Sequence, residues 1–178
     1  MLTSLLSANA GRVQMLDRPR KGRIPGFMAE LSKDLVGTKL EAFSIDVERG
    51  KIKEFCQAIG ETNPIYTDVA AAKEAGYEDT PAPPTFQTSF AFWGVGFDEF
   101  WEGLGKLGID TTRLLHMKEE YEYVKPLYPG MTIHSQAEIV DVKIGKMNMV
   151  TMRNEYKDDK GEVCIKADMA IVIRPEGK

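Results

Sequence analysis

Cysteine, histidine and surplus basic charge are all scarce in this sequence, and each scarcity removes a class of function. The 178 residues include 2 Cys and 2 His. Cys56 and Cys164 are too few and too far apart for a disulfide framework, so we expect a reducing compartment, the cytoplasm. Lys and Arg number 23 against 27 Asp and Glu, which argues against a nucleic-acid partner because phosphate contacts need a concentrated basic face. His116 and His134 have no Cys or carboxylate at ligand spacing, and we predict no metal site.

Long apolar runs of the kind that cross a membrane are also missing. The longest uncharged stretch, residues 80–97, is interrupted by prolines, which favours a buried element over a membrane span. Residues 1–15 lack a basic region before an apolar core, so no secretory signal is expected. We divide the chain into a basic arm over residues 1–34, flexible or extended, and a single domain over residues 35–178 that is long enough to bury its own core.

Hydrophobic periodicity predicts a strand and helices in the first half of the domain. Leu40–Val47 alternates apolar and polar residues, and the period becomes helical over Glu48–Ile59. On that helix we expect one buried apolar face, made of Ile52, Phe55, Cys56 and Ile59. Thr67 or Asp68 is expected to cap a short helix that runs to Glu74 and ends at Gly76. Pro84–Val95 is apolar on nearly every side and predicts a helix surrounded by protein.

Four strands are predicted to follow as a meander. They cover Leu114–Val124, Met131–Lys143, Met147–Tyr156 and Val163–Ile173, with turns at Pro129-Gly130, at residues 144–146 and at residues 158–161. In the first of them, Leu115, Met117, Tyr121 and Tyr123 are expected to share one face. This element order predicts an α+β hot-dog fold, in which an antiparallel sheet wraps a central apolar helix. Such a sheet leaves an open edge, and we expect two domains to pair there.

The candidate site begins with the stretch GETNPIYTD, residues 60–68, and continues in PAPPTF, residues 81–86. Together with LLHMKEEYEYVKPLYPGMTI, these segments resemble the MaoC-like hot-dog dehydratases and hydratases. The resemblance is greatest to the FAS1-like (MaoC N-terminal) dehydratase domain branch, which includes non-catalytic subunits of 3-hydroxyacyl-acyl-carrier-protein dehydratases. It covers about Leu35–Arg174.

The resemblance implies a lyase reaction on acyl thioesters, as in fatty acid metabolism, without a cofactor. In catalytic members an Asp and a His hold the water that adds to an enoyl thioester, and backbone N–H groups at the start of the central helix polarise the thioester carbonyl. The Asp position corresponds to Glu61 and the His position to Tyr66, while Asn63 and Pro64 match. Tyr66 is a poor base because its unperturbed pKa is near 10.

The helix start differs from catalytic members as well. Where they carry a His-Gly pair, this chain is expected to carry Pro83 and Pro84, and proline has no N–H to donate. We therefore expect an altered catalytic pair, Glu61 and Tyr66, next to substrate-binding residues that comprise Asn63, Pro84, Thr85 and Phe86.

Two simpler interpretations of these residues stay open. Glu61 and Asn63 are also residues that satisfy backbone groups in a turn before proline, and Tyr66 also suits a core position. The aromatic residues between Phe86 and Trp101 are mainly core residues, and a subset of them is expected to line an acyl-chain tunnel.

Three functions are compatible with these residues and with the family resemblance. The first is a subunit that binds an acyl-CoA or acyl-carrier-protein thioester and supports a catalytic hot-dog partner in a heterodimer. The second is a homodimeric enoyl-CoA hydratase in which Glu61 is the base, Tyr66 the acid, and Asn63 or Thr85 orients the thioester. The third is an acyl-thioester or lipid-binding module that catalyses no reaction.

Overall fold

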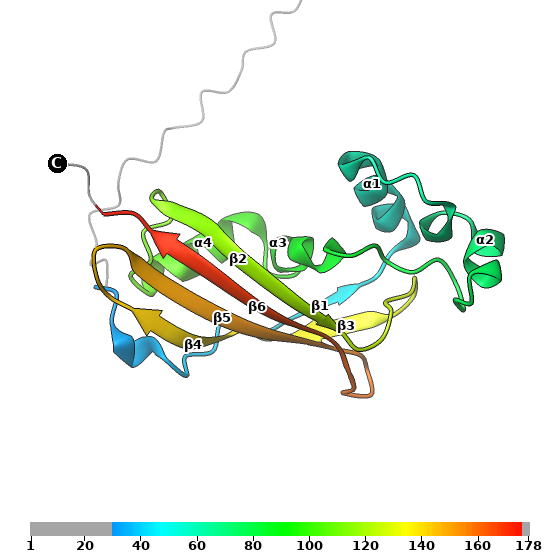
Figure 1. The fold of residues 1–178 in the computed structure, drawn as a ribbon. Coiled ribbons are helices and arrows are strands. Elements are labelled where there is room, and N and C mark those ends of the chain that lie inside the picture. The colour runs from blue at the N-terminus through cyan, green and yellow to red at the C-terminus, as the bar shows by residue number, and fades with distance from the viewer. Residues whose placement is uncertain (1–29, 176–178) are drawn as a thin grey trace, which may run out of the picture.

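An antiparallel sheet with a layer of helices on one face forms the body of the protein in a computed structural model that describes residues 30–175 (Figure 1). The strands are β1 (Phe43–Asp46), β2 (Leu114–Tyr123), β3 (Thr132–Ser135), β4 (Glu138–Lys143), β5 (Asn148–Lys157) and β6 (Val163–Ile173). The helices are α1 (Arg49–Ile59), α2 (Val69–Glu74), α3 (Phe90–Gly94) and α4 (Phe97–Lys106), with short 3-10 turns η1 (Lys33–Leu35), η2 (Pro64–Tyr66) and η3 (Phe86–Ser89). The predicted α+β hot-dog fold is confirmed, while the basic arm lies almost entirely outside the described residues.

The strand order is β1-β3-β5-β6-β2, and β4 also pairs with β5. The strand expected over Met131–Lys143 is therefore split into β3 and β4, which both pair with β5 on either side of a bend at Gln136 and Ala137. The meander prediction was wrong for β2. This strand pairs with β6 at the sheet edge and not with the strand that follows it in sequence.

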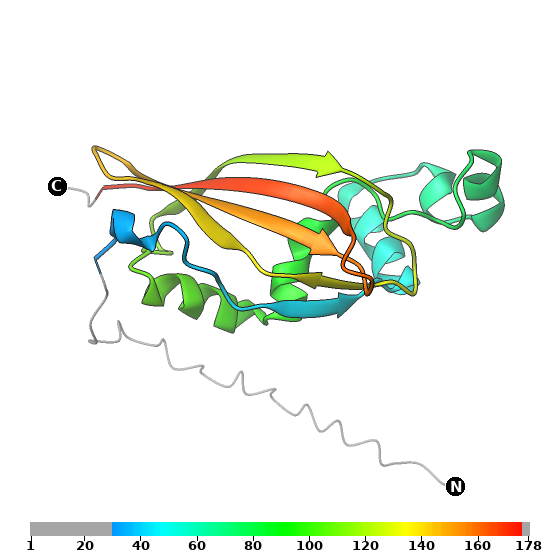
Figure 2. The same cartoon turned by 90° about the horizontal axis from the view of Figure 1, so that it is seen from below.

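The helix predicted over Pro84–Val95 is present as η3 followed by α3, at the start of the central helical layer. A further helix that was not predicted, α4, follows after Gly96, whose φ of 106° is outside the helical range. Gly94 lies so close to Phe43 of β1 that a Cβ at this position would overlap the ring. The absence of a side chain thus lets α3 approach β1, beside which it lies in Figure 2.

Two clusters of buried side chains form the core along this layer. One surrounds Phe86 and Phe90 near β1 and α1, and the other surrounds Leu104 near β4 and β5. The prediction of a helix enclosed by protein is correct for Phe86 and Phe90 but wrong for Trp93, which is exposed in this single chain. On α1, Ile52 and Cys56 are buried as expected, whereas Ile59 is exposed because it lies at the helix end, next to Gly60.

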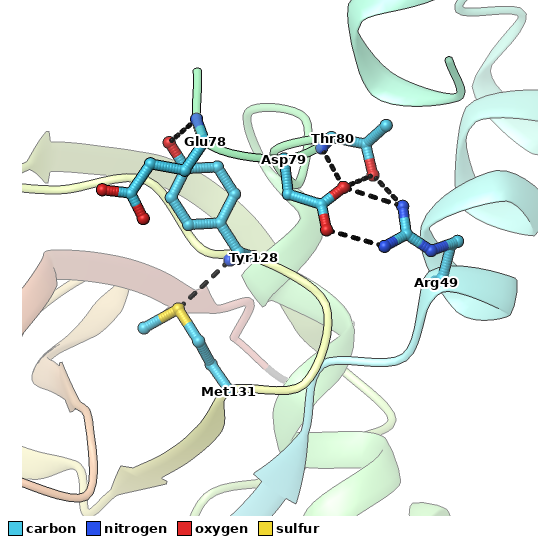
Figure 3. Close-up of polar contacts among 6 residues, drawn as sticks. All are labelled: Arg49, Glu78, Asp79, Thr80, Tyr128 and Met131. Carbon is cyan, nitrogen blue, oxygen red and sulfur yellow. Dashed lines mark hydrogen bonds and ion pairs between the residues drawn. The ribbon is translucent and has the colours of Figure 1, made fainter. Parts of the chain in front are cut away.

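Helices α1 and α2 lie together at one end of the molecule, beyond the sheet (Figure 1). Asp68 caps α2 by accepting hydrogen bonds from the N–H groups of Ala70 and Ala71, as predicted. Arg49, at the start of α1, makes a two-point ion pair with Asp79, with N–O distances of 2.9 and 2.8 Å, and also donates to Thr80 (Figure 3). This contact links the first turn of α1 to the segment around Asp79 and Thr80, which leads into the central layer.

A bulge divides the face of β2. The register with β6 shifts between His116 and Lys118, so the apolar residues before and after the bulge point to opposite sides. Tyr121 faces the helical layer and packs against the core, whereas Leu115 and Met117 are exposed. The single apolar face expected for this strand is therefore wrong in its first half. Over residues 30–175, no helix combines the length and apolar character that crossing a bilayer requires.

Candidate functional site

The stretch GETNPIYTD forms the connection between α1 and α2. Gly60 ends α1 in the left-handed conformation, with φ 71°, and the N–H of Glu61 then donates to the carbonyl of Cys56 at 2.8 Å. The Glu61 carboxylate accepts a hydrogen bond from the N–H of Asn63 at 2.7 Å, and the Asn63 side chain accepts one from the N–H of Ile65 at 3.2 Å. Both polar side chains thus stabilise the turn that leads into η2, as the simpler interpretation of these residues expects.

Tyr66 ends η2 and is half-buried against the core cluster that contains Cys56 and Phe86. Burial raises the pKa of the Tyr66 phenol, and the nearby Glu61 carboxylate raises that pKa further. The same two causes raise the pKa of the Cys56 thiol. The Glu61 carboxylate therefore acts on Tyr66 in the same direction as burial does, and the phenol keeps its proton at neutral pH.

The second part of the site is the start of the central layer. Pro84 is exposed, Phe86 is buried, and Thr85 between them has φ 70°, the left-handed conformation that glycine adopts most easily. The N–H of Thr85 is present and donates to the hydroxyl of Tyr123 at 3.0 Å, as does the Gln87 side chain at 3.2 Å. Tyr123, on β2, was expected on an apolar strand face and was not predicted to be part of the site.

These observations change the expected account of the helix start. The expected loss of a donor rested on Pro83 and Pro84, yet the residue in the glycine-like conformation is Thr85, which retains its N–H. The carbonyl of Pro83 accepts from the N–H of Phe86 at 3.2 Å and so forms the turn. The start of the layer thus keeps one backbone donor that now binds the Tyr123 hydroxyl.

A cavity of about 450 Å³ lies between the helical layer and the inner face of the sheet. Its wall is mainly apolar and includes Phe92, Phe100, Trp101, Leu104, Met152 and Met169. Of the aromatic residues between Phe86 and Trp101, three therefore line the cavity, which the sequence alone did not decide. None of the six predicted site residues contributes to this wall, although Thr88, at the start of the layer, does.

The two histidines occupy separate surroundings. His134 is exposed and is hydrogen-bonded to Ser44 at 2.7 Å and to Asp159 at 2.9 Å. His116 lines the cavity, and its Nε2 lies 3.5 Å from the Glu119 carboxylate. Within residues 30–175, no group of three Cys, His, Asp or Glu side chains is arranged to hold a metal ion.

An antiparallel sheet over a central helix, with an Asn-Pro turn at its end, defines the class of MaoC-like hot-dog dehydratase folds. Comparison with known families agrees, because residues 34–167 match the family described as "FAS1-like, dehydratase domain region". The chain belongs to this family.

Two related proteins are similar to most of the chain. A UPF0336 protein of Thermobifida fusca is 32% identical over 148 residues, which cover 81% of this chain and 94% of that protein. A UPF0336 protein of Streptomyces coelicolor is 35% identical over 147 residues, which cover 81% and 95%.

Solved structures support the same fold at lower identity. The C-terminally truncated HadBC (3R-hydroxyacyl-ACP dehydratase) complex of Mycobacterium tuberculosis is similar with a TM-score of 0.64 at 24% identity, covering 78% of this chain and 97% of that chain. The ChsH1–ChsH2 complex of the same organism also has a TM-score of 0.64 at 24% identity, covering 79% and 87%. At this identity the likeness establishes the fold alone.

Proposed function

We propose that the protein is an acyl-binding subunit of a cytoplasmic enoyl-thioester hydratase or 3-hydroxyacyl-thioester dehydratase. The observation that carries the proposal is the apolar cavity of about 450 Å³, which extends from the start of the central layer along α3 and α4. An apolar cavity of this kind suits the alkyl chain of an acyl-CoA or acyl-carrier-protein thioester. The thioester itself would lie at the start of the layer, near Thr85.

The supporting role follows from the state of the altered catalytic pair. Hydration needs a base to take a proton from water and an acid to protonate the α-carbon. The Glu61 carboxylate is held by a backbone N–H of its own turn, and the raised pKa of Tyr66 keeps this phenol protonated, so that it is not available as a base and is a weaker acid than an ordinary tyrosine. We therefore assign the chemistry to a hot-dog partner that carries an intact Asp and His.

The proposed partner is consistent with two structural neighbours, the complexes HadBC and ChsH1–ChsH2. The partnership could also be formed by two copies of this chain. In that case Glu61 and Tyr66 would act as base and acid, and one observation favours this second candidate. The two groups are close enough for Glu61 to affect the pKa of Tyr66, and the N–H of Thr85 is retained.

Hydration of a short enoyl-coenzyme A separates the candidates. The assay compares the chain alone with the chain plus a MaoC-type partner that has an intact Asp and His, using wild type, Glu61→Gln, Tyr66→Phe and the control Glu74→Gln, an exposed position on α2. We expect turnover only with the partner, at a rate that Glu61→Gln leaves unchanged. Turnover by the chain alone that Glu61→Gln abolishes would instead identify a self-sufficient hydratase. Acyl-thioester binding without product in either mixture would identify a binding module.

A further inference from the structure

The hydroxyl of Tyr123 joins the edge strand β2 to the start of the central layer. It accepts two hydrogen bonds, one from the N–H of Thr85 at 3.0 Å and one from the side-chain amide of Gln87 at 3.2 Å. A phenolic oxygen has two lone pairs and one hydrogen atom, so these two bonds occupy both lone pairs. Among residues 30–175, no hydrogen bond takes up the remaining hydroxyl hydrogen. Because the side chain is 47% exposed, this hydrogen is free to bind a ligand.

Tyr123 belongs to one of the two elements that wall the apolar cavity and is bonded to the other. Strand β2 contributes His116 and Glu119 to the wall, and the start of the central layer contributes Thr88. The hydroxyl of Thr88 donates to the carbonyl of Thr85 at 2.6 Å. The bond between Thr85 and Tyr123 is therefore next to the end of the cavity at which the layer starts.

The turn that carries the altered catalytic pair adjoins the same start. Tyr66 packs against the core cluster that contains Phe86, the residue after Thr85. An acyl thioester with its alkyl chain in the cavity and its thioester towards this turn would have its carbonyl beside the Tyr123 hydroxyl. A hydroxyl hydrogen is the group that a carbonyl oxygen can accept.

This arrangement places a side-chain donor where a backbone donor was expected. The N–H of Thr85 is aimed at the Tyr123 oxygen and so is not directed at a ligand. Hydrogen bonds in a chain polarise one another, so the two bonds that Tyr123 accepts strengthen the bond that its own O–H can donate. Tyrosine hydroxyls are among the side-chain donors that stabilise carbonyl oxygens in enzyme sites.

We propose that Tyr123 binds the thioester carbonyl of the acyl ligand through its hydroxyl hydrogen. This inference rests on the proposed acyl-binding function and adds the residue that distinguishes a thioester from other ligands with a long alkyl chain. Tyr123 binds and orients the thioester, and it keeps its proton throughout.

Calorimetry with two ligands of equal chain length tests the inference. Dodecanoyl-CoA has the carbonyl, and S-dodecyl-CoA, a thioether, has a methylene group in its place. The proteins are wild type, Tyr123→Phe and the control Tyr128→Phe. The control is matched because the Tyr128 hydroxyl also accepts a backbone N–H, that of Glu78 at 3.3 Å (Figure 3), while Tyr128 does not line the cavity.

Wild type and Tyr128→Phe are expected to bind the thioester about fivefold more tightly than the thioether, as one neutral hydrogen bond allows. Tyr123→Phe is expected to bind both ligands equally, with the affinity that wild type has for the thioether. A thioester preference that Tyr123→Phe retains would overturn the inference, because the N–H of Thr85 or another donor would then bind the carbonyl. Equal affinities in wild type would overturn it without any variant and would leave acyl binding intact. If wild type binds neither ligand, the acyl-binding proposal and this inference both fail.

Infrared spectroscopy provides a readout that a purely structural role of Tyr123 would not change. A hydrogen bond lowers the stretching frequency of a carbonyl, which is measured with dodecanoyl-CoA that is isotope-labelled at its carbonyl carbon. The frequency is expected to be lower in complexes of wild type and Tyr128→Phe than in the complex of Tyr123→Phe. Near-ultraviolet circular dichroism establishes that each variant is folded. The same frequency in all three complexes would overturn the inference.

Discussion

Thr85 holds a left-handed backbone conformation that glycine adopts easily and that is unfavourable for a β-branched residue. Among residues 30–175 it is the one non-glycine residue with a positive φ, 70°. A β-branched side chain in this region costs about 1–3 kcal/mol, and such strain persists where the surrounding structure enforces it, often at functional sites. Here the hydrogen bond from the Thr85 N–H to Tyr123 contributes to that enforcement. The strained residue thus lies at the proposed thioester position.

Replacing this residue by glycine tests whether the conformation is strained. Thr85→Gly removes the unfavourable contact of the side chain, but it also gives the unfolded chain more freedom, about 0.5–1 kcal/mol. We expect an unfolding free energy that is unchanged or raised by up to about 2 kcal/mol, measured by urea unfolding. Thr67→Gly is the control because Thr67 has a φ of −131°, which suits threonine, and it should lose about 1 kcal/mol. Equal losses in both variants would contradict the assignment of strain.

Residue types alone predicted only part of the site. Glu61 and Asn63 were predicted because their roles are local, within a turn before a proline. Tyr123 and Glu119 were missed because their surroundings depend on the register of β2 against β6 and on the approach of the central layer. The spacing of residues in the sequence indicates neither the strand register nor the position of the central layer. A tyrosine and a glutamate on an alternating strand suit an exposed edge equally well.

The ion pair between Arg49 and Asp79 connects two elements at the end of the molecule. Arg49 lowers the pKa of Asp79 to about 2 from its ordinary 3.8, chiefly through its hydrogen bonds to the carboxylate. A lowered pKa in the folded state stabilises the fold above the unfolded pKa, and this stabilisation disappears as the pH falls towards the folded pKa. The pair should therefore contribute above about pH 4 and lose its contribution by about pH 2.

Arg49→Met is expected to lower the melting temperature at about pH 5 and to converge with wild type as the pH falls to about 2. Thermal unfolding monitored by circular dichroism over this range measures the difference. Lys53→Met removes an exposed cation from the same helix and serves as the control. The difference in melting temperature between Lys53→Met and wild type should not disappear as the pH falls from about 5 to about 2. If the difference in melting temperature between Arg49→Met and wild type stays constant down to about pH 2, the ion pair does not stabilise the contact between α1 and the segment that contains Asp79.

At the level of elements, periodicity predicted most strands but not the places where they bend. Long alternation fixed β5 and β6 closely, since each buries one face along its whole length. The bulge at His116, the bend at Gln136 and the restart of the helical layer as α4 after Gly96 were not predicted. Each of these irregularities adapts one element to another that is distant in sequence. The cavity, which forms between these bent elements, could not be predicted in detail either.

For the whole molecule, β2 is the sheet edge that is expected to mediate pairing with a second hot-dog domain. In the sheet it pairs with β6 and ends the strand order. Its bulge turns Leu115 and Met117 outward, and Met117 is 51% exposed. Exposed apolar side chains on an open edge are an unfavourable surface for an isolated chain, and a partner strand would cover them.

A charge placed on this edge should therefore prevent pairing without unfolding the domain. Met117→Lys is expected to convert a pair of subunits into single chains, because a lysine on an edge strand opposes strand addition. Met147→Lys is the control because it introduces the same charge at a residue that is 60% exposed between β4 and β5, away from this edge. Light scattering of each protein, alone and mixed with the catalytic hot-dog partner, gives the number of chains. If Met147→Lys separates the subunits and Met117→Lys does not, the interface lies elsewhere, since both variants carry the same added charge and differ only in its position.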